Sequence, residues 1–496
     1  MKSFYPLQKG IVSILFILLF HYLWKWELTG INLILTEILL LAYAWYRNGF
    51  RKSFSNYINI AAFLFSSIGF LIHGSAWSIF INVLSCLLLF AQSFSISENL
   101  IEPFTYALLR MIPFIKEEKK GSLVRKSGNR FRWTYIAIPL FLIFAFGALY
   151  ANAIPGFSDF FADFFRLFPR LDFYSLLLLF LGYIITLYAW RGTTFKITLL
   201  SEWALTEEQT RTRFTQVKGL TRRLLNEYFI HRITLVSLVA LITMAVFFDI
   251  VDLSKQEWKY QTYESVQNGV HSGTTALVIA IMASIFLAAY VFRGNLQFYP
   301  KDSSLKKLTY AWLGLNGLLS ITLAYRSWGY IQMFNLAYKR IAILVFILCA
   351  LYGLYTVFLK IAKTKSLSFI LRQNMNMVLA CCALTALPNW DRIIVNYNLN
   401  HSEAYQDYDY LFTRDLEVLL DHRELPVLKT VVLGNSPNYR MAYHAYGDIT
   451  VYDYLQKRML FERDELKKVT WKSMYLSRYR LKQFLDQLEI QEEVVD

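Results

Sequence analysis

Long apolar stretches recur along the chain between Ile11 and Pro388, separated by short polar gaps. Each stretch is close to the roughly 20 residues that a helix needs to cross a bilayer at about 1.5 Å per residue. This pattern predicts an all-α fold, a polytopic bundle of transmembrane helices. We expect about eleven spans, at residues 11–26, 30–46, 57–74, 77–95, 134–154, 173–190, 232–250, 273–292, 309–327, 340–361 and 374–388.

Every second gap between these stretches is rich in Lys and Arg. The basic gaps follow the second, fourth, sixth, eighth and tenth spans, at residues 47–56, 96–133, 191–231, 293–308 and 362–373. Short loops that carry Lys and Arg stay in the cytoplasm, so the N-terminus is expected there. An odd number of spans then places the tail after Pro388 outside the cytoplasm, and a count changed by one would reverse that side.

The distribution of charge along the chain favours localisation in a membrane over binding to nucleic acid. The formal net charge is +15, yet residues 391–496 carry 14 Lys and Arg against 18 Asp and Glu. The positive excess therefore lies in loops that flank apolar spans, where topology and anionic lipid headgroups account for it. No nucleic-acid-binding motif accompanies the charge, so we expect the lipid bilayer as partner and no nucleic acid.

Composition and motifs give no sign of a cofactor, a metal or a known catalytic site. The four cysteines lie inside apolar stretches, without the spacing of a zinc site or a disulfide framework. The first apolar run ends in Leu23-Trp24-Lys25-Trp26 instead of a small-residue cleavage site. We therefore interpret it as a retained span and not as a signal peptide.

Composition divides the chain into four parts. Residues 1–96 hold N-terminal transmembrane helices, 97–133 a basic cytoplasmic loop, 134–390 the central bundle and 391–496 a polar, mainly helical domain. Segment Leu100–Phe114 is expected to lie at the membrane interface. Segment Pro155–Arg170 carries six Phe residues at helical spacing, which fits either an interfacial amphipathic helix or a lid packed on the bundle.

The end of the last span carries a motif with a family likeness. The chain reads Pro388-Asn389-Trp390-Asp391 and continues through Ile393-Ile394-Val395-Asn396-Tyr397-Asn398-Leu399. A second stretch runs from Tyr330 through Asn335-Leu336-Ala337-Tyr338-Lys339-Arg340, and a third, shorter one is Tyr263-Glu264-Ser265-Val266 with Gly269. These stretches resemble a family of bacterial multi-pass membrane proteins, a domain of unknown function of the 4173/4153 type.

The chain departs from the family pattern at three positions. Trp390 stands where the family has Pro, Asn335 where it often has Gly, and Ala337 where it often has Thr. The resemblance implies an inner-membrane protein. It implies no activity, because none is established for the family.

Glu37 is the clearest ionisable residue within a predicted span. A charged group there costs free energy to insert, so such residues are functional candidates. One interpretation is a relay for a proton or cation. The other is a carboxyl group that pairs with an Arg or a hydroxyl inside the bundle.

A second set of polar residues flanks three spans on the predicted extracytoplasmic side. Because their gaps share that side, we expect them to form one cluster in which an Arg pairs with an acid. Its role is either an ion-paired lock for the tail or a substrate site. The candidate residues are Glu264, His271, Arg326, Tyr330, Arg340, Asn389, Asp391 and Tyr397.

Three functions stay open at this stage. The first is a non-enzymatic membrane protein whose tail binds a protein or envelope partner. The second is a transporter or channel that uses Glu37. The third is a membrane enzyme that acts on lipid-linked substrates through the polar cluster.

Overall fold

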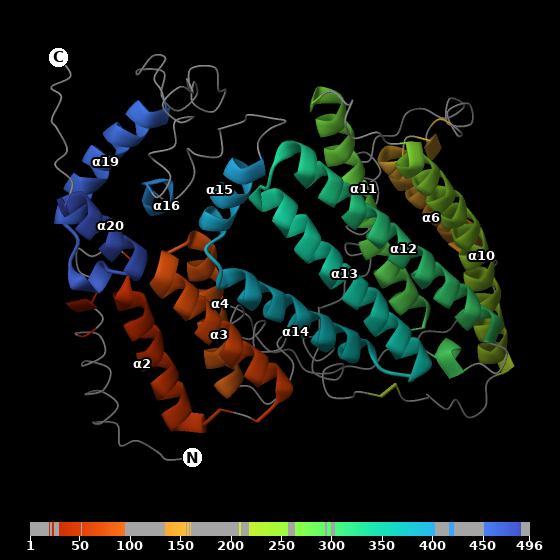
Figure 1. The fold of residues 1–496 in the computed structure, drawn as a ribbon. Helices are drawn as coiled ribbons and strands as arrows, with labels where there is room; N and C mark the ends of the chain where they lie inside the picture. The colour runs from red at the N-terminus through yellow and green to blue at the C-terminus, as the bar shows by residue number, and fades with distance from the viewer. Residues whose placement is uncertain are drawn as a thin grey trace. The chain divides into compact units, whose positions relative to one another are not determined.

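In a computed structural model, the described part of the chain is helical, apart from one isolated antiparallel bridge between Glu208 and Lys365 (Figure 1). The structure describes residues 19, 22–23, 29–50, 52–94, 134–154, 156–157, 159, 208–209, 218–255, 263–292, 295–298, 303–401, 416–420 and 451–487. These residues form thirteen α-helices and two 3-10 helices. The predicted all-α class is confirmed.

Nine helices occupy the predicted membrane region. They are α2 (Ile31–Asn48), α3 (Phe54–His73), α4 (Ala76–Phe94), α6 (Thr134–Ala153), α10 (Lys218–Lys255), α11 (Tyr263–Val291), α12 (Ser303–Phe334), α13 (Tyr338–Ala362) and α14 (Leu367–Ala386). The short helix η2 covers Asn295–Phe298. The tail contains α15 (Trp390–His401), α16 (Leu416–Leu420), α19 (Val451–Lys467), η6 (Trp471–Ser473) and α20 (Leu476–Gln487).

Five described helices are long and apolar enough to cross a membrane, so the chain is a multi-pass membrane protein by helix length and composition. These segments are Phe54–His73, Leu224–Ser254, Thr274–Val291, Tyr338–Ala362 and Leu367–Ala386. Three shorter apolar helices cover Ile31–Tyr46, Ala76–Phe90 and Pro139–Ala151. The expected count of eleven is not confirmed. Span 173–190 and most of span 11–26 lie outside the described residues, as do segment Leu100–Phe114 and most of Pro155–Arg170.

Helix α12 shows why length and hydropathy do not select the same helices. It covers the predicted span 309–327, yet it is not among the five apolar segments. Its apolar residues alternate with Gly, Asn, Ser and Tyr, which lower the mean hydropathy of any window along it.

The chain folds into two compact units that are not contiguous in sequence. Unit 1 contains residues 1–112, 334–339 and 378–496, and unit 2 contains residues 113–333 and 340–377. The N-terminal helices and the C-terminal tail therefore belong to one unit.

Unit 1 is built around α2, α3 and α4, whose closest pair is α3 with α4. The side chain of Ser53 accepts a hydrogen bond from the Asn56 N–H and so caps the start of α3. Gly74 ends the same helix in a left-handed conformation (φ +65°), and its N–H donates to the Phe70 carbonyl. In the tail, α16, α19 and α20 share a small apolar core that includes Leu419, Leu455 and Leu485.

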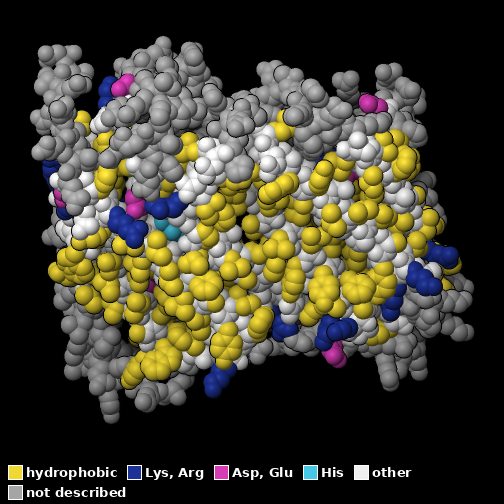
Figure 2. Space-filling view, viewed as in Figure 1, with side chains coloured by type: hydrophobic (Ala, Val, Ile, Leu, Met, Phe, Trp, Pro, Cys, Tyr) yellow, Lys and Arg dark blue, Asp and Glu magenta, His cyan; other side chains and the backbone are white. Residues whose placement is uncertain are grey.

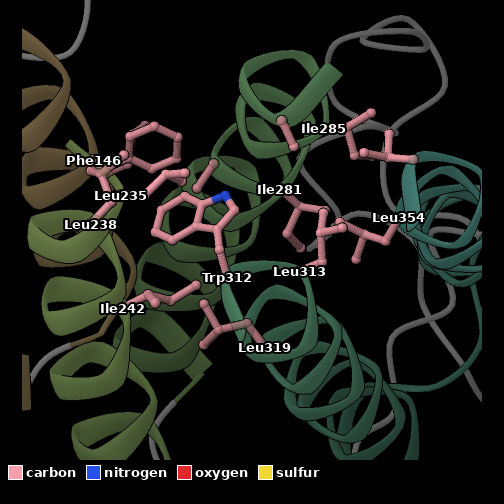
Figure 3. Close-up of a cluster of buried hydrophobic side chains, with 14 of the residues drawn as sticks. Phe146, Leu235, Leu238, Ile242, Ile281, Ile285, Trp312, Leu313, Leu319 and Leu354 are labelled. Carbon is pink, nitrogen blue, oxygen red and sulfur yellow. The ribbon is translucent and has the colours of Figure 1, made fainter. Parts of the chain in front are cut away.

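Unit 2 has a larger apolar core between α6, α10, α11, α12 and α13. Figure 3 shows Trp312 of α12 pointing between Phe146 of α6 and Leu235 of α10. The Phe146 and Trp312 rings meet edge to face with centroids 5.2 Å apart. Phe157 is also fully buried in this core, so the start of segment Pro155–Arg170 packs on the helices of its own unit.

Large apolar side chains are also exposed on these helices. Hydrophobic side chains cover much of the described surface in the face that Figure 2 shows. Phe286 of α11 is 65% exposed, Phe247 of α10 62% and Leu384 of α14 60%. Apolar surface on this scale is unusual in a water-soluble chain, and the acyl chains of a bilayer are its natural cover.

Candidate functional sites

Glu37 lies inside the three-helix part of unit 1 and is only 4% exposed. One end of the Asn82 amide, on α4, contacts both oxygens of the Glu37 carboxyl group, Oε1 at 3.1 Å. The other end lies 2.7 Å from Oγ of Ser67 on α3. Among the described residues no Lys, Arg or His pairs with Glu37. The site thus joins three helices through an acid, an amide and a hydroxyl.

Further polar contacts line the interior of the same helices. Asn59 of α3 donates from Nδ2 to Oε1 of Gln92 on α4 at 3.1 Å, and both side chains are buried. Ser78 of α4 donates to the carbonyl of Ala386 at the end of α14 at 2.9 Å. In hydrocarbon such bonds hold helices together, because lipid supplies no hydrophobic force between them.

The tail is attached to the ends of α2 and α3. The N–H of Ile31 donates to the Met474 carbonyl at 3.2 Å, and the Lys472 ammonium donates to the Tyr22 carbonyl at 2.8 Å. A Cβ built on Gly30 would lie 2.2 Å from the carbonyl carbon of Ser473. Residue 30 must therefore lack a side chain for η6 to approach α2 this closely.

The second attachment is made to the C-terminal end of α3. A Cβ on Gly74 would lie 2.3 Å from the ring of Tyr475, which also packs against Phe70 with centroids 5.9 Å apart. The Arg478 guanidinium lies over the Tyr475 ring, 4.4 Å from its centroid. The segment between η6 and α20 thus packs on two helix ends at once.

Two of the family-like stretches contact each other inside unit 1. The side-chain amide of Asn398 receives the N–H of Leu336 at 2.7 Å and donates to the Leu336 carbonyl at 3.0 Å. The Tyr338 hydroxyl donates to Asp391 at 2.8 Å. Asn335 has a φ of +69°, a conformation that Gly adopts freely and that Asn tolerates best among other residues. Asn at position 335 is therefore compatible with the left-handed backbone of this turn.

Three of the remaining members of the predicted polar cluster, Asn389, Tyr330 and Arg340, have local contacts. Asn389 accepts from the Arg392 N–H at the start of α15, and Tyr397 is half-buried on the same helix. In unit 2 the Arg340 guanidinium lies 4.4 Å from the centroid of the Tyr330 ring. The side chains of Glu264 and His271 lie outside the described residues. A single cluster of all eight residues stays a prediction.

Arg326 of α12 forms an ion pair with Asp249 of α10, a residue that the sequence analysis did not select. The Asp249 side chain is fully buried, and Arg326 also donates to the Ala153 carbonyl at the end of α6 at 3.3 Å. Asp252, three residues further along α10, accepts from the Gly156 N–H at 2.8 Å. These bonds tie the ends of three helices together, which is a structural role for Arg326.

A second charged group missed by sequence reasoning is Lys360, near the other end of unit 2. Its fully buried ammonium donates to the Phe292 carbonyl at 2.8 Å and to the side-chain oxygens of Gln209 and Gln297 at 3.2 and 3.3 Å. Gln209 also donates from its backbone N–H to Thr364. Lys360 stands at the end of its predicted span, where a Lys is expected to reach headgroups, so the pattern gave no signal for burial.

No group of three His, Cys, Asp or Glu side chains in the described ranges could hold a metal ion. Hydrogen bonds or an ion pair join several of these polar side chains across helices. The fold defines the chain as a helical multi-pass membrane protein. The domain of unknown function DUF4153 matches residues 11–420, most of the chain. The chain therefore belongs to the DUF4153 family, which confirms the predicted resemblance. No curated protein and no solved structure matches it.

Proposed function

We propose that this protein is an inner-membrane protein whose C-terminal helical domain is an extracytoplasmic binding module for a partner protein. The observation that carries the proposal is the construction of the tail. It has its own apolar core, yet close contacts at Gly30 and Gly74 hold it on membrane helices. A domain held in this way presents a constant surface, and a binding module gains affinity from such preorganisation.

The proposed side follows from the helix ends that the tail contacts. It packs on the start of α2 and the end of α3. The basic gap 47–56 joins the opposite ends of these two helices. The tail and this basic gap are thus on opposite sides of the bundle, and a gap rich in Lys and Arg is retained in the cytoplasm.

The proposed contact surface is the outer face of α19. Leu455, Met459 and Leu466 of this helix are buried against the rest of the tail, whereas Phe461 is 68% exposed. The exposed Phe stands among Glu462, Arg463 and Asp464. An aromatic side chain surrounded by charges of both signs has the composition of a protein-binding hot spot with a polar rim.

A photo-crosslinking amino acid at position 461 in intact cells tests this function. We expect one discrete adduct with a second protein, and no such adduct from the matched control at the exposed Asp486 of α20. A ladder of adducts with an envelope polymer, or equal adducts from both positions, would contradict a protein partner. Reporter fusions after Asp496 test the side, and cytoplasmic activity of the reporter would refute the proposed orientation.

Transport is a second candidate, and the burial of Glu37 among neutral groups favours it. If the protein moves an ion through this site, Glu37→Gln should abolish the flux while leaving the amount of inserted protein unchanged. An unchanged flux would remove transport through Glu37. The membrane-enzyme hypothesis stays a prediction, which alanine variants of Glu264, Arg340 and Asp391 would test.

A further inference from the structure

The hydrogen bonds around Asn82 depend on whether Glu37 carries a proton. The Asn82 amide has a donor end and an acceptor end of nearly the same size, and its orientation is assigned from the neighbouring groups. One end faces the Glu37 carboxyl group and the other faces Ser67. Each orientation therefore requires a particular protonation state.

In the first orientation the Asn82 nitrogen faces α3. It donates to Oγ of Ser67 at 2.7 Å and lies 3.4 Å from both Oγ of Ser66 and the Phe63 carbonyl. The two serine protons are already used within α3, since Ser67 donates to Phe63 at 2.7 Å and Ser66 donates to Ala62 at 2.7 Å. The Asn82 amide and the hydroxyls of Ser66 and Ser67 then all donate to an acceptor. The Asn82 oxygen faces Glu37, so the carboxyl group has to supply the proton for that contact.

In the second orientation the Asn82 nitrogen donates to an ionised Glu37 carboxylate. The Asn82 oxygen then faces Ser67 Oγ at 2.7 Å and needs its proton. Ser67 has one hydroxyl proton, which it would have to withdraw from the Phe63 carbonyl. This state gives up one hydrogen bond of α3 and leaves a net negative charge between membrane helices, which is costly. The first orientation is therefore the more stable of the two.

We propose that Glu37 is a proton-binding site whose protonated carboxyl group donates a hydrogen bond to Oδ1 of Asn82 in this conformation. When Glu37 releases its proton to water, the Asn82 amide group flips by about 180°. The Ser67 hydroxyl then donates to the Asn82 oxygen instead of the Phe63 carbonyl. The carboxylate then accepts from the amide nitrogen. Glu37 and Asn82 are hydrogen-bonded in both states, so α2 and α4 stay joined while the proton exchanges.

The surroundings of Glu37 are suited to a proton and not to a larger ligand. The titratable group that the structure places beside it is the Cys86 thiol of α4, which is buried. From α3 the hydroxyls of Ser66 and Ser67 contact the other end of the Asn82 amide. The Asn82 amide contacts both carboxyl oxygens directly, which leaves no room for a hydrated metal ion between them.

Infrared difference spectroscopy on the full-length protein in lipid nanodiscs tests the proposal. At neutral pH the wild type should show the carbonyl band of a protonated carboxylic acid that is absent from Glu37→Gln. In deuterated water this band should shift to lower frequency. A difference spectrum in which Glu37→Gln removes only carboxylate bands would overturn the proposal.

Two further variants test whether Asn82 accepts a hydrogen bond from the protonated Glu37 carboxyl group. Asn82→Leu removes the acceptor, so the carbonyl band of Glu37 should move to higher frequency. Asn316→Leu is the matched control, because Asn316 is a fully buried Asn of α12 in the other unit. An equal shift in both variants, or none in Asn82→Leu, would refute this hydrogen bond. If Asn82→Leu does not accumulate, Asn82→Ala removes the same acceptor with a smaller side chain and should move the band in the same direction.

Discussion

The two units bury different kinds of interior. Between α2, α3 and α4 of unit 1, the buried residues include Glu37, Asn59, Ser66, Asn82 and Gln92. The interior of unit 2 is mainly apolar and aromatic around Trp312, and its buried charges, Asp249 and Lys360, lie near helix ends. Side-chain hydrogen bonds form a larger part of the interior of unit 1, and packed large side chains form a larger part of the interior of unit 2.

This difference follows from helix length and packing area. Helices α2, α3 and α4 have 18 to 20 residues, whereas α10 has 38 and α12 has 32. Long helices offer many apolar contacts, and dispersion between close-packed side chains adds up over them. Short helices in lipid have fewer such contacts, so directed polar bonds and close backbone approach contribute a larger share of the attraction.

The largest expected effect comes from the buried ion pair of unit 2. Arg326→Met leaves the buried Asp249 carboxylate without its cation, so the free energy of unfolding should fall by about 3 to 5 kcal/mol. Denaturant titration of the purified protein in detergent measures this loss. The double variant Asp249→Leu with Arg326→Met removes both charges and should regain most of the stability. A double variant no more stable than the single one would show that the pair does more than neutralise a buried charge.

The middle effect tests the close approach of helices in unit 1. A Cβ on Gly69 of α3 would lie 2.1 Å from the Ala386 carbonyl oxygen, so Gly69→Ala should destabilise the protein by about 1 to 3 kcal/mol. Gly317 of α12 has no atom within 4 Å of such a Cβ. Gly317→Ala should therefore stabilise α12 by about 0.5 to 1 kcal/mol, because Gly is a poor helix former. Thermal unfolding of both variants decides, and equal shifts of the same sign would contradict the difference between the units.

The smallest effect concerns a single hydrogen bond in unit 1. Asn59→Leu removes the bond to Gln92 and should cost about 0.6 to 1.7 kcal/mol, the range for such bonds between membrane helices. Replacing both residues by Leu should be nearly neutral, because no buried amide is then left without a partner. A double-mutant cycle in detergent measures the coupling. Additive losses would mean that this bond does not join α3 to α4.

Much of the fold was predictable, because the positions of apolar residues determine where membrane helices form. The predicted span 57–74 corresponds to α3, and the tail residues Leu455, Met459 and Leu466 lie on one face of α19. Helix ends were less predictable. Helix α10 begins at Lys218, well before the predicted span 232–250, because a helix continues past the apolar zone where hydropathy no longer marks it.

The partners of polar residues were the least predictable part of the sites. Glu37 was selected by its position in a span, but its contact with Asn82 depends on how α2 and α4 are rotated about their axes. Asp249 stands one residue before the end of its predicted span, which made it resemble an interfacial residue. Arg326 also stands one residue before the end of its own predicted span. A comparison of the depths of the two residues in the membrane would therefore have indicated that Asp249 and Arg326 can pair.

The contact between Gly30 and Ser473 has a consequence for how the protein is made. The ribosome finishes α2 long before it reaches η6, and at about 5 to 20 residues per second the interval is tens of seconds. During that interval the first helices are already in the membrane, but the tail segment that packs on them has not been synthesised. The hydrogen bonds from Glu37 and Asn59 to α4 involve only the first hundred residues. They can therefore hold α2, α3 and α4 together before the tail is synthesised.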